Sequence, residues 1–275
     1  MNRIRVAVAA GALSVLAIGC QSEQTTQGGV VGVDRKQSMT SLVSAKEIEQ
    51  QASQEYSQLI AQAQKKGLLN QNPQHVQRVR TTAQRLVPHV SAFRPDALNW
   101  KWETNVLTSK DVNAWCMPGG KIAVYTGLIE RLDLTDAELA AVMGHEIAHA
   151  LREHARERIS RQMATQTGTA IGAVALEIFT GIRIDPSLAG TVSEAAFVLP
   201  NSREAEQEAD RIGVELAARA GYDPRAAVTL WQKMAKLGGS APPQWLSTHP
   251  SNETRLQDLE VYTQKVMPLY RAAAR

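Results

Sequence analysis

The sequence that decides the fold is Gly-His-Glu-Ile-Ala-His, which covers residues 144–149. It lies inside a predicted helix that begins with a capping box at Thr135 and continues to about Gln162. Apolar residues recur along this segment every three or four positions, which predicts a face packed into a core. Because His145 and His149 are four residues apart, both rings project from the same side of that helix.

Two histidines at this spacing can bind one zinc ion, with nitrogen ligands at about 2.0–2.1 Å, without bending the helix. Glu146 is turned about 100° from His145, beside the metal, where a general base takes a proton from the attacking water. The alternative is a helix that merely carries two histidines, but its apolar flanks and the small Gly144 favour a centre with one zinc ion per chain. His154 is turned about 140° from His149 and is expected to be solvated.

A catalytic zinc site needs a third protein ligand and one open position. The helix predicted over residues 202–220 carries four acidic candidates, namely Glu204, Glu206, Glu208 and Asp210. Glu206 borders the apolar face of that helix, whereas Glu204 and Glu208 fall toward solvent. Asp210 is one turn beyond Glu206, where it can accept a hydrogen bond from a ligand imidazole.

The fold around these helices is expected to be α+β. Three short strands are predicted over residues 98–105, 112–116 and 121–126. Short connections between them, including the turn Pro118-Gly119-Gly120, imply a small antiparallel sheet. We therefore expect a mostly helical, zincin-like catalytic domain with this sheet beside the histidine helix. Further helices are predicted over residues 44–66, 73–86 and 253–269.

Residues Asn113, Ala114 and Trp115 lie on the second predicted strand, which is a candidate exposed edge. An extended peptide can add to such an edge through main-chain hydrogen bonds. This mode of binding reads few side chains and requires an unfolded substrate. The three residues are therefore candidate substrate-binding positions.

Residues 168–184 are apolar apart from Glu177 and Arg183. The stretch is too short and too interrupted to span a bilayer. We expect a core helix here, and the alternative is a flap or a lipid-facing surface.

The N-terminus has the organisation of a lipoprotein signal peptide over residues 1–19. Arg3 and Arg5 precede an apolar run, and small residues lead up to Cys20. This pattern resembles a bacterial lipobox, which implies cleavage after Gly19 and diacylation of Cys20, with a plain signal peptide or anchor as the alternative. Gln21 follows the cysteine, and the resemblance to Gram-negative lipoproteins then implies the outer membrane, facing the periplasm. Residues 20–43 are polar and glycine-rich and are expected to tether the domain of residues 44–275 to the lipid.

Composition argues against nucleic acid as a partner. The net charge of +3 falls to +1 when Arg3 and Arg5 are removed with the signal peptide, so no strong basic field remains. The chain has two cysteines, which excludes a disulfide framework. If Cys20 is lipidated, Cys116 is a lone thiol and is expected to pack as a small buried hydrophobe.

The order of motifs in this chain resembles a known family of zinc proteases. Residues 144–154 are followed by Ser-Arg-Glu-Ala-Glu-Gln-Glu-Ala-Asp at 202–210 and by Ser-Thr-His-Pro at 247–250. This series is similar to the gluzincins of the HtpX and CAAX prenyl endopeptidase type, and in particular to their periplasmic lipoprotein branch, which includes LoiP and BepA. The resemblance implies that Glu206 is the third zinc ligand and that Asp210 supports the site.

His249 and Arg255 are candidate donors to the oxyanion that forms during peptide hydrolysis. In proteins similar to this one, the histidine of the His-Pro loop lies near zinc and can occupy the open position at rest. A loop-capping role is the alternative for His249.

Together these features predict a zinc metalloendopeptidase of the bacterial envelope, with Glu146 as general base. Unfolded or misassembled envelope proteins are the expected substrates, and the outer-membrane assembly machinery is a further candidate partner. One alternative is a zinc-binding chaperone or assembly factor, although binding alone needs no base such as Glu146. The other is a structural lipoprotein in which the histidine motif is fortuitous.

Overall fold

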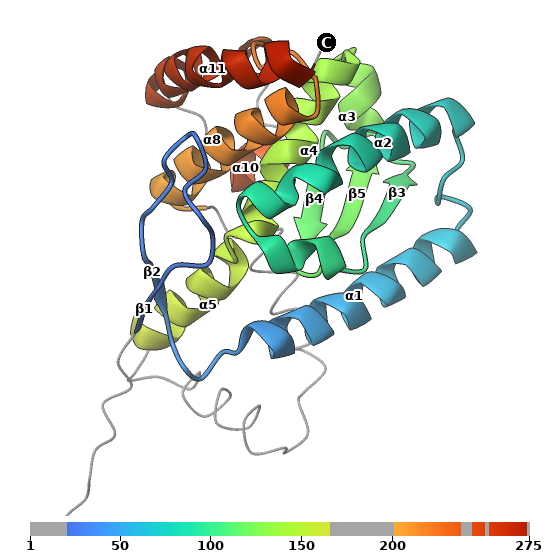
Figure 1. The fold of residues 1–275 in the computed structure, drawn as a ribbon. Coiled ribbons are helices and arrows are strands. Elements are labelled where there is room, and N and C mark those ends of the chain that lie inside the picture. Colours follow the sequence, from blue (N-terminus) through green and yellow to red (C-terminus); the bar gives the residue numbers. More distant parts are fainter. Residues whose placement is uncertain (1–20, 166–200, 238–243, 251–252, 274–275) are drawn as a thin grey trace, which may run out of the picture.

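The computed structural model describes residues 21–165, 201–237, 244–250 and 253–273. Helices predominate in these residues, and a three-stranded sheet lies among them (Figure 1). The predicted α+β class is therefore confirmed.

The sheet consists of β3 (Glu103–Leu107), β4 (Ala114–Met117) and β5 (Lys121–Tyr125), in the order β3-β5-β4. β4 and β5 form the expected antiparallel hairpin, and Gly119 and Gly120 of its turn have positive φ angles. β3 pairs with β5 in parallel, so the prediction of a purely antiparallel sheet is wrong. The reason is that β5 returns between β3 and β4, where it runs in the direction of β3.

The first strand begins later than predicted, at Glu103. The 3₁₀ helix η2 (Pro95–Asn99) occupies the first part of the expected strand. Trp100 and Trp102 stack with their ring centroids 5.5 Å apart, and the indole N–H of Trp102 donates to the carbonyl of Ala97 at 2.8 Å. The alternation of apolar and polar residues here therefore reflects a local aromatic cluster.

Helices cover both faces of the sheet. α1 (Ala45–Lys65) packs on one face, and α2 (Pro73–Leu86) and α4 (Asp136–Leu151) share a core with the other (Figure 1). Successive strand residues alternate between the two cores: Trp115 packs with α1, whereas Cys116 joins the larger cluster. The predicted capping box at Thr135 begins α4. The short helices η1 (Val87–Ala92) and α3 (Thr126–Arg131) follow α2 and β5 respectively.

The histidine helix is shorter than predicted, because the chain breaks after Leu151. A new helix, α5 (His154–Thr165), starts three residues later. Glu153 between the two helices has a φ of 52°, which a helix does not accommodate. Its carboxylate pairs with Arg94 at 2.5 Å and with Arg156 at 2.8 Å. These ion pairs stabilise the bend between α4 and α5.

The C-terminal helices form a layer on α4. α8 (Arg203–Arg219) lies along α4, and α11 (Glu253–Ala273) covers α8 (Figure 1). α9 (Ala226–Lys236) contacts both α4 and α11. The short α10 (Gln244–Thr248) ends just before His249.

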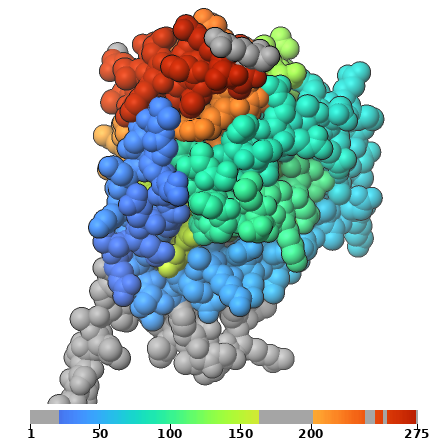
Figure 2. All heavy atoms as spheres, viewed as in Figure 1, coloured from blue at the N-terminus to red at the C-terminus, as the bar shows by residue number. Residues whose placement is uncertain are grey.

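The N-terminal segment, residues 21–43, packs on the domain and is not the flexible tether predicted for it. Its strands β1 (Gln21–Glu23) and β2 (Gln37–Met39) pair in antiparallel, and β2 contacts α5. Val31 and Val33, between the strands, are buried in the main core. In Figure 2 the blue surface of this segment lies directly against the red surface of α11.

Cys20 and residues 168–184 lie outside the described residues, so the lipid anchor and the core helix or flap stay predictions. Of the helices that are described, none is both long enough and apolar enough to cross a membrane. Cys116 is buried, as expected, and this burial raises the pKa of its thiol.

Candidate metal centre

Four side chains converge from separate parts of the fold: His145 and His149 from α4, Glu206 from α8, and His249 after α10. Nε2 of His145 lies 3.0 Å from Nε2 of His149 and 3.2 Å from Nδ1 of His249. Oε1 of Glu206 lies 3.3 Å from Nε2 of His149. The structure thus brings together the three residues predicted as ligands, and His249 joins them.

The chemistry and spacing of these atoms fit zinc. Atoms bound at about 2.0–2.1 Å to a tetrahedral zinc ion are separated by about 3.3 Å. The imidazole and carboxylate atoms of the group are 3.0 to 3.5 Å apart, close to that value. A cation between them would receive lone pairs that otherwise face one another. The four residues His145, His149, Glu206 and His249 would therefore hold the ion.

Two glycines set the distance between the helices that carry these ligands. A Cβ atom on Gly144 would lie 2.8 Å from the carbonyl oxygen of Gly213, and one on Gly213 would lie 2.8 Å from the amide nitrogen of His145. Real Cβ atoms do not approach so closely, so α4 and α8 touch through their backbones. This close approach lets Glu206 reach histidines on the neighbouring helix.

The imidazole of His145 is supported directly from α8. Its Nδ1 lies 2.9 Å from Oδ1 of Asp210, as predicted for a carboxylate behind a metal ligand. Arg255 donates to both oxygens of Asp210, at 2.7 and 2.8 Å, and pairs with Glu206 at 2.8 Å. Because Arg255 is buried against these carboxylates, it supports the ligands and is not placed as the oxyanion donor that the sequence suggested.

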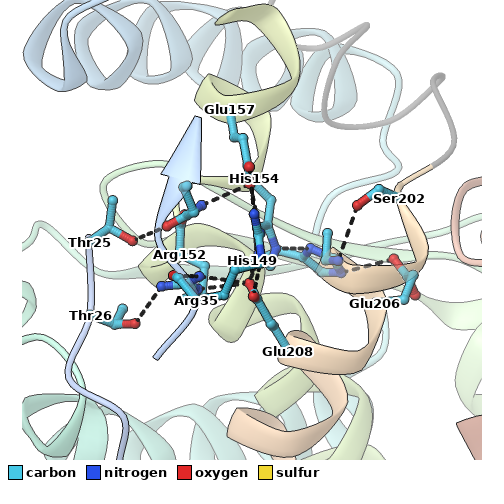
Figure 3. Close-up of polar contacts among 12 residues, drawn as sticks. Thr25, Thr26, Arg35, His149, Arg152, His154, Glu157, Ser202, Glu206 and Glu208 are labelled. Atoms are coloured by element: carbon cyan, nitrogen blue, oxygen red, sulfur yellow. Dashed lines mark hydrogen bonds and ion pairs between the residues drawn. The ribbon is translucent and has the colours of Figure 1, made fainter. Parts of the chain in front are cut away.

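The imidazole of His149 is supported by two residues that the sequence placed in solvent. His154 and Glu208 are both buried, so that prediction is wrong. Nδ1 of His154 lies 2.8 Å from Nδ1 of His149, and its Nε2 lies 3.0 Å from Glu208 (Figure 3). The bend after Leu151 is the reason, because it turns His154 back toward the site. Glu204, in contrast, is exposed as expected.

Neighbouring charges control the ionisation of the site. Burial alone would raise the pKa of Glu206, but the charges of His249 and Arg255 and the bonds from the imidazoles hold it well below its ordinary value. Burial lowers the pKa of His149 well below its ordinary value, which Glu206 only partly offsets. An ionised carboxylate and a neutral imidazole are the forms that bind a metal ion.

Glu146 lies beside the metal group, as a general base requires. The indole N–H of Trp245 donates to its Oε1 at 2.7 Å, and Nε2 of His249 lies 3.5 Å from the same oxygen. The ring of Trp245 also stacks on His249, with centroids 4.7 Å apart. Sequence reasoning missed Trp245, since no spacing links it to the histidine motif; its only signal is its position four residues before His249.

A cleft connects the metal group to the edge of the sheet. It is lined by Trp115 and Cys116 of β4, by Glu146 and His149 of α4, by Arg158 of α5 and by Asn201 before α8. Arg158 and Asn201, which contact each other, were not predicted from the sequence. The predicted edge strand therefore lies at the site, but its four residues are buried, so the predicted exposure is wrong.

The register of β4 refines the predicted substrate positions. The carbonyl of Asn113 accepts from the amide of Tyr125, so alternate residues of β4 bond to β5. Ala114 and Cys116 therefore turn their backbone groups away from β5. The side chain of Asn113 already accepts from the Ala114 amide at 3.0 Å. The carbonyl of Ala114 and the backbone of Cys116 are thus better placed to meet a peptide than the backbone of Asn113.

The model of Peptidase family M48 matches residues 73–263. The chain is 45% identical over 154 residues to mitochondrial metalloendopeptidase OMA1 of Arabidopsis thaliana, which covers 56% of this chain and 30% of that protein. It is 36% identical over 171 residues to the human metalloendopeptidase OMA1, with 58% and 32% covered. It is 28% identical over 204 residues to the beta-barrel assembly-enhancing protease of Escherichia coli K12, with 72% and 41% covered.

The chain spans less than half the length of each of these relatives. They include both mitochondrial and bacterial proteins, so the assignment to a periplasmic lipoprotein branch stays a prediction. The matched residues contain all four members of the metal group, together with Glu146, whereas the N-terminal segment and α1 precede them. On this match, the chain belongs to Peptidase family M48.

Proposed function

We propose that this chain is a zinc-dependent endopeptidase in which Glu146 is the general base. One observation carries the proposal: a carboxylate that is not needed as a ligand lies buried beside a zinc-type donor set and lines the same cleft. A site that only bound metal would gain nothing from this carboxylate. Family M48 membership supports the same activity.

A zinc ion held by His145, His149 and Glu206 would supply Lewis-acid chemistry for the scissile carbonyl and the attacking water. Glu146 accepts a proton from the attacking water and delivers it to the leaving amine. Trp245 orients this carboxylate by donating to Oε1, which leaves Oε2 for the proton. Asp210 and Arg255 hold His145 and Glu206 in their places while this occurs.

We propose that His249 is a removable fourth ligand. Four protein atoms would complete a tetrahedral shell and leave no position for water or substrate. Catalysis then requires His249 to leave the group. If so, His249→Ala raises kcat for a short peptide and leaves one zinc ion per chain, whereas a fall in kcat with unchanged KM would instead support the role of oxyanion donor.

We propose that substrates bind in extended form along β4. Addition of a strand needs an unfolded segment, so misfolded or misassembled proteins are the expected substrates. The test compares ribonuclease in its folded, disulfide-intact form with the same protein after reduction and alkylation. Only the second should be cleaved; equal cleavage of both would contradict this mode of binding.

We propose a location in the bacterial envelope, with a lipid on Cys20 and the domain facing the periplasm from the outer membrane. The supporting pattern is the lipobox-like N-terminus. Radiolabelled palmitate should label the expressed full chain but not Cys20→Ser, and the variant should leave the membrane fraction. Labelling of both chains, or of neither, would contradict the anchor.

A second candidate is an assembly factor for outer-membrane proteins that cleaves little. The E. coli relative is a beta-barrel assembly-enhancing protease, which favours this candidate. The two functions separate in Glu146→Gln, which keeps all four members of the metal group. Full cellular function of that variant would favour the assembly factor, and loss of function would favour the protease.

The direct test of the enzyme uses reduced, alkylated ribonuclease with wild type, Glu146→Gln and wild type treated with a chelator. We expect Glu146→Gln to retain zinc and to lose activity by about 100- to 10,000-fold. Chelation should abolish cleavage, and added zinc should restore it. Activity that survives both changes would disprove the mechanism.

A further inference from the structure

His154 is a buried imidazole to which the proposed reaction assigns no role. It is the first residue of α5, and only 2% of its surface is exposed. Its Nδ1 lies 2.8 Å from Nδ1 of His149, and its Nε2 lies 3.0 Å from Oε2 of Glu208. Dashed lines in Figure 3 mark these contacts, which lead from Glu208 through His154 to His149.

The protons of this pair can be placed in only one way if His149 binds metal through Nε2. The ligating nitrogen offers its lone pair, so the proton of the neutral His149 ring is on Nδ1. That N–H donates to Nδ1 of His154, which must carry a lone pair there and its own proton on Nε2. The Nε2–H of His154 donates in turn to the carboxylate of Glu208. Each hydrogen bond therefore selects the tautomer of the next ring.

Glu208 can act as the fixed end of this series because two guanidinium groups hold it. Arg152, which is fully buried, donates to Oε2 of Glu208 at 3.0 and 2.8 Å. Arg35 donates to Oε2 at 3.0 Å and also contacts Oε1. Arg35 pairs in addition with Glu157 at 2.7 Å. The carboxylate is thereby held by both guanidinium groups as well as by His154 (Figure 3).

Arg35 belongs to the N-terminal segment, which precedes the residues matched by the family model. The same segment holds Arg152: Oγ1 of Thr26 and the carbonyl of Arg35 accept from it at 3.1 and 2.9 Å. Gln37 contacts the carbonyl of Arg152 and donates to Glu157 at 3.1 Å. The N-terminal segment, which resembles a linker in sequence, thus contacts both Glu208 and Arg152.

We infer that His154 is a positioning residue for the metal ligand His149, and that the N-terminal segment completes this support by fixing Glu208 through Arg35. The inference rests on the proposed function only in that His149 must bind the metal. It assigns to the N-terminal segment a contribution to the metal centre as well as to the fold.

The test uses Co²⁺ as a spectroscopic probe in place of zinc, with the full chain in every case. His154→Leu removes the acceptor from His149, whereas His154→Asn places an amide oxygen where Nδ1 stood. Arg35→Met removes one guanidinium from Glu208. Lys36→Met is its matched control, because Lys36 is the exposed neighbour in the same segment and carries the same charge.

We expect His154→Leu to weaken zinc binding by about 10- to 100-fold and to change the visible Co²⁺ absorption, with partial recovery of both in His154→Asn. Arg35→Met should weaken zinc binding by a smaller factor, about 3- to 10-fold. Lys36→Met should match wild type. Thermal unfolding of each metal-free variant defines a temperature at which all are folded, and the binding is measured there.

Variants that lower thermal stability but leave the Co²⁺ spectrum and the zinc affinity unchanged would overturn the inference, since a merely structural role predicts that result. Equal effects of Arg35→Met and Lys36→Met would overturn the part assigned to the N-terminal segment. These outcomes are distinct from a failure of the proposed function. In that case wild type itself would bind no metal at His149, and the inference would fall with it.

Discussion

The two histidine ligands on α4 are supported in different ways. His145 contacts its carboxylate, Asp210, directly at 2.9 Å. His149 reaches its carboxylate, Glu208, only through the ring of His154. The direct support involves residues of α8 and α11, whereas the indirect support extends to the N-terminal segment.

The difference follows from the geometry of α8. Glu206, Glu208 and Asp210 are spaced by two residues, which turns successive side chains by about 200° around the helix axis. Asp210 therefore faces His145 beside Glu206. Glu208 is turned toward Arg152 and His154, just after the end of α4, and reaches His149 only through His154. α8 can thus support both histidine ligands of α4. Only His145 is contacted directly, and the support of His149 passes through the ring of His154.

The largest effect on zinc binding is expected for Glu206, the ligand that faces both histidines. Glu206→Ala removes the carboxylate that faces both histidines, so the purified chain should contain no stoichiometric zinc by elemental analysis. Glu204→Ala is the matched control, because Glu204 is exposed on the same turn of α8. One zinc ion retained per chain in Glu206→Ala would mean that the three histidines suffice.

The direct support of His145 is tested by Asp210→Ala. Loss of the acceptor behind His145 should weaken zinc binding by about 10- to 100-fold, measured by competition with a chelating dye. Asp258→Ala is the control, since it also removes an ion pair between α11 and α8, with Arg211 at 2.7 Å, but away from the metal group. Equal losses in both variants would attribute the effect to helix packing.

The indirect support of His149 is tested by Glu208→Gln. We expect this variant to bind zinc at most about 10-fold more weakly than wild type. The amide oxygen of glutamine can still accept from Nε2 of His154, so the orientation of both rings is largely kept. The same competition assay ranks this variant against Asp210→Ala. If Glu208→Gln binds zinc more weakly than Asp210→Ala, the support of His149 through His154 contributes more to zinc binding than the direct support of His145.

The smallest effect concerns the attachment of the N-terminal segment and its dependence on pH. Burial alone would raise the pKa of Glu157, but hydrogen bonds from Arg35 and Gln37 lower it from 4.5 to about 2. The ionised carboxylate therefore stabilises the folded chain above about pH 4.5, and this contribution is lost as the pH falls toward 2.

Urea unfolding of the metal-free chain between pH 5 and 2.5, values chosen to bracket roughly this window, measures the effect. Glu157→Gln should lower the free energy of unfolding at pH 5 and should flatten its fall toward acid. Glu260→Gln changes an exposed carboxylate on α11 and should keep the slope of wild type. An unchanged slope in Glu157→Gln would show that other carboxylates control acid unfolding.

Helical periodicity was sufficient to predict much of the centre. His145, Glu146 and His149 follow from spacing on one helix, and the apolar face of α8 pointed to Glu206 and Asp210. The boundaries of α2 were also predicted correctly, from Pro73 to Leu86. These features depend on neighbours within one or two turns of the same element.

The support of His149 by His154 and Glu208 was not predicted, because it depends on contacts between distant segments. A helix continued past Leu151 places His154 in solvent, and nothing in the composition signals the positive φ of Glu153. Glu208 was assigned to solvent because a charged residue off the apolar face is usually exposed. Its buried carboxylate is paired in part with Arg35, which lies 173 residues earlier in the chain.

The contact between Gly144 and Gly213 makes the absence of a side chain a requirement of the metal chemistry. Zinc tolerates deviations of only about 0.2 Å in its ligand distances. A methyl group at either glycine would collide with backbone at 2.8 Å and would force the two helices to separate. Anyone who transplants this centre into another protein must therefore reproduce the backbone spacing of the helix pair, because copying the ligands alone would leave Glu206 out of reach.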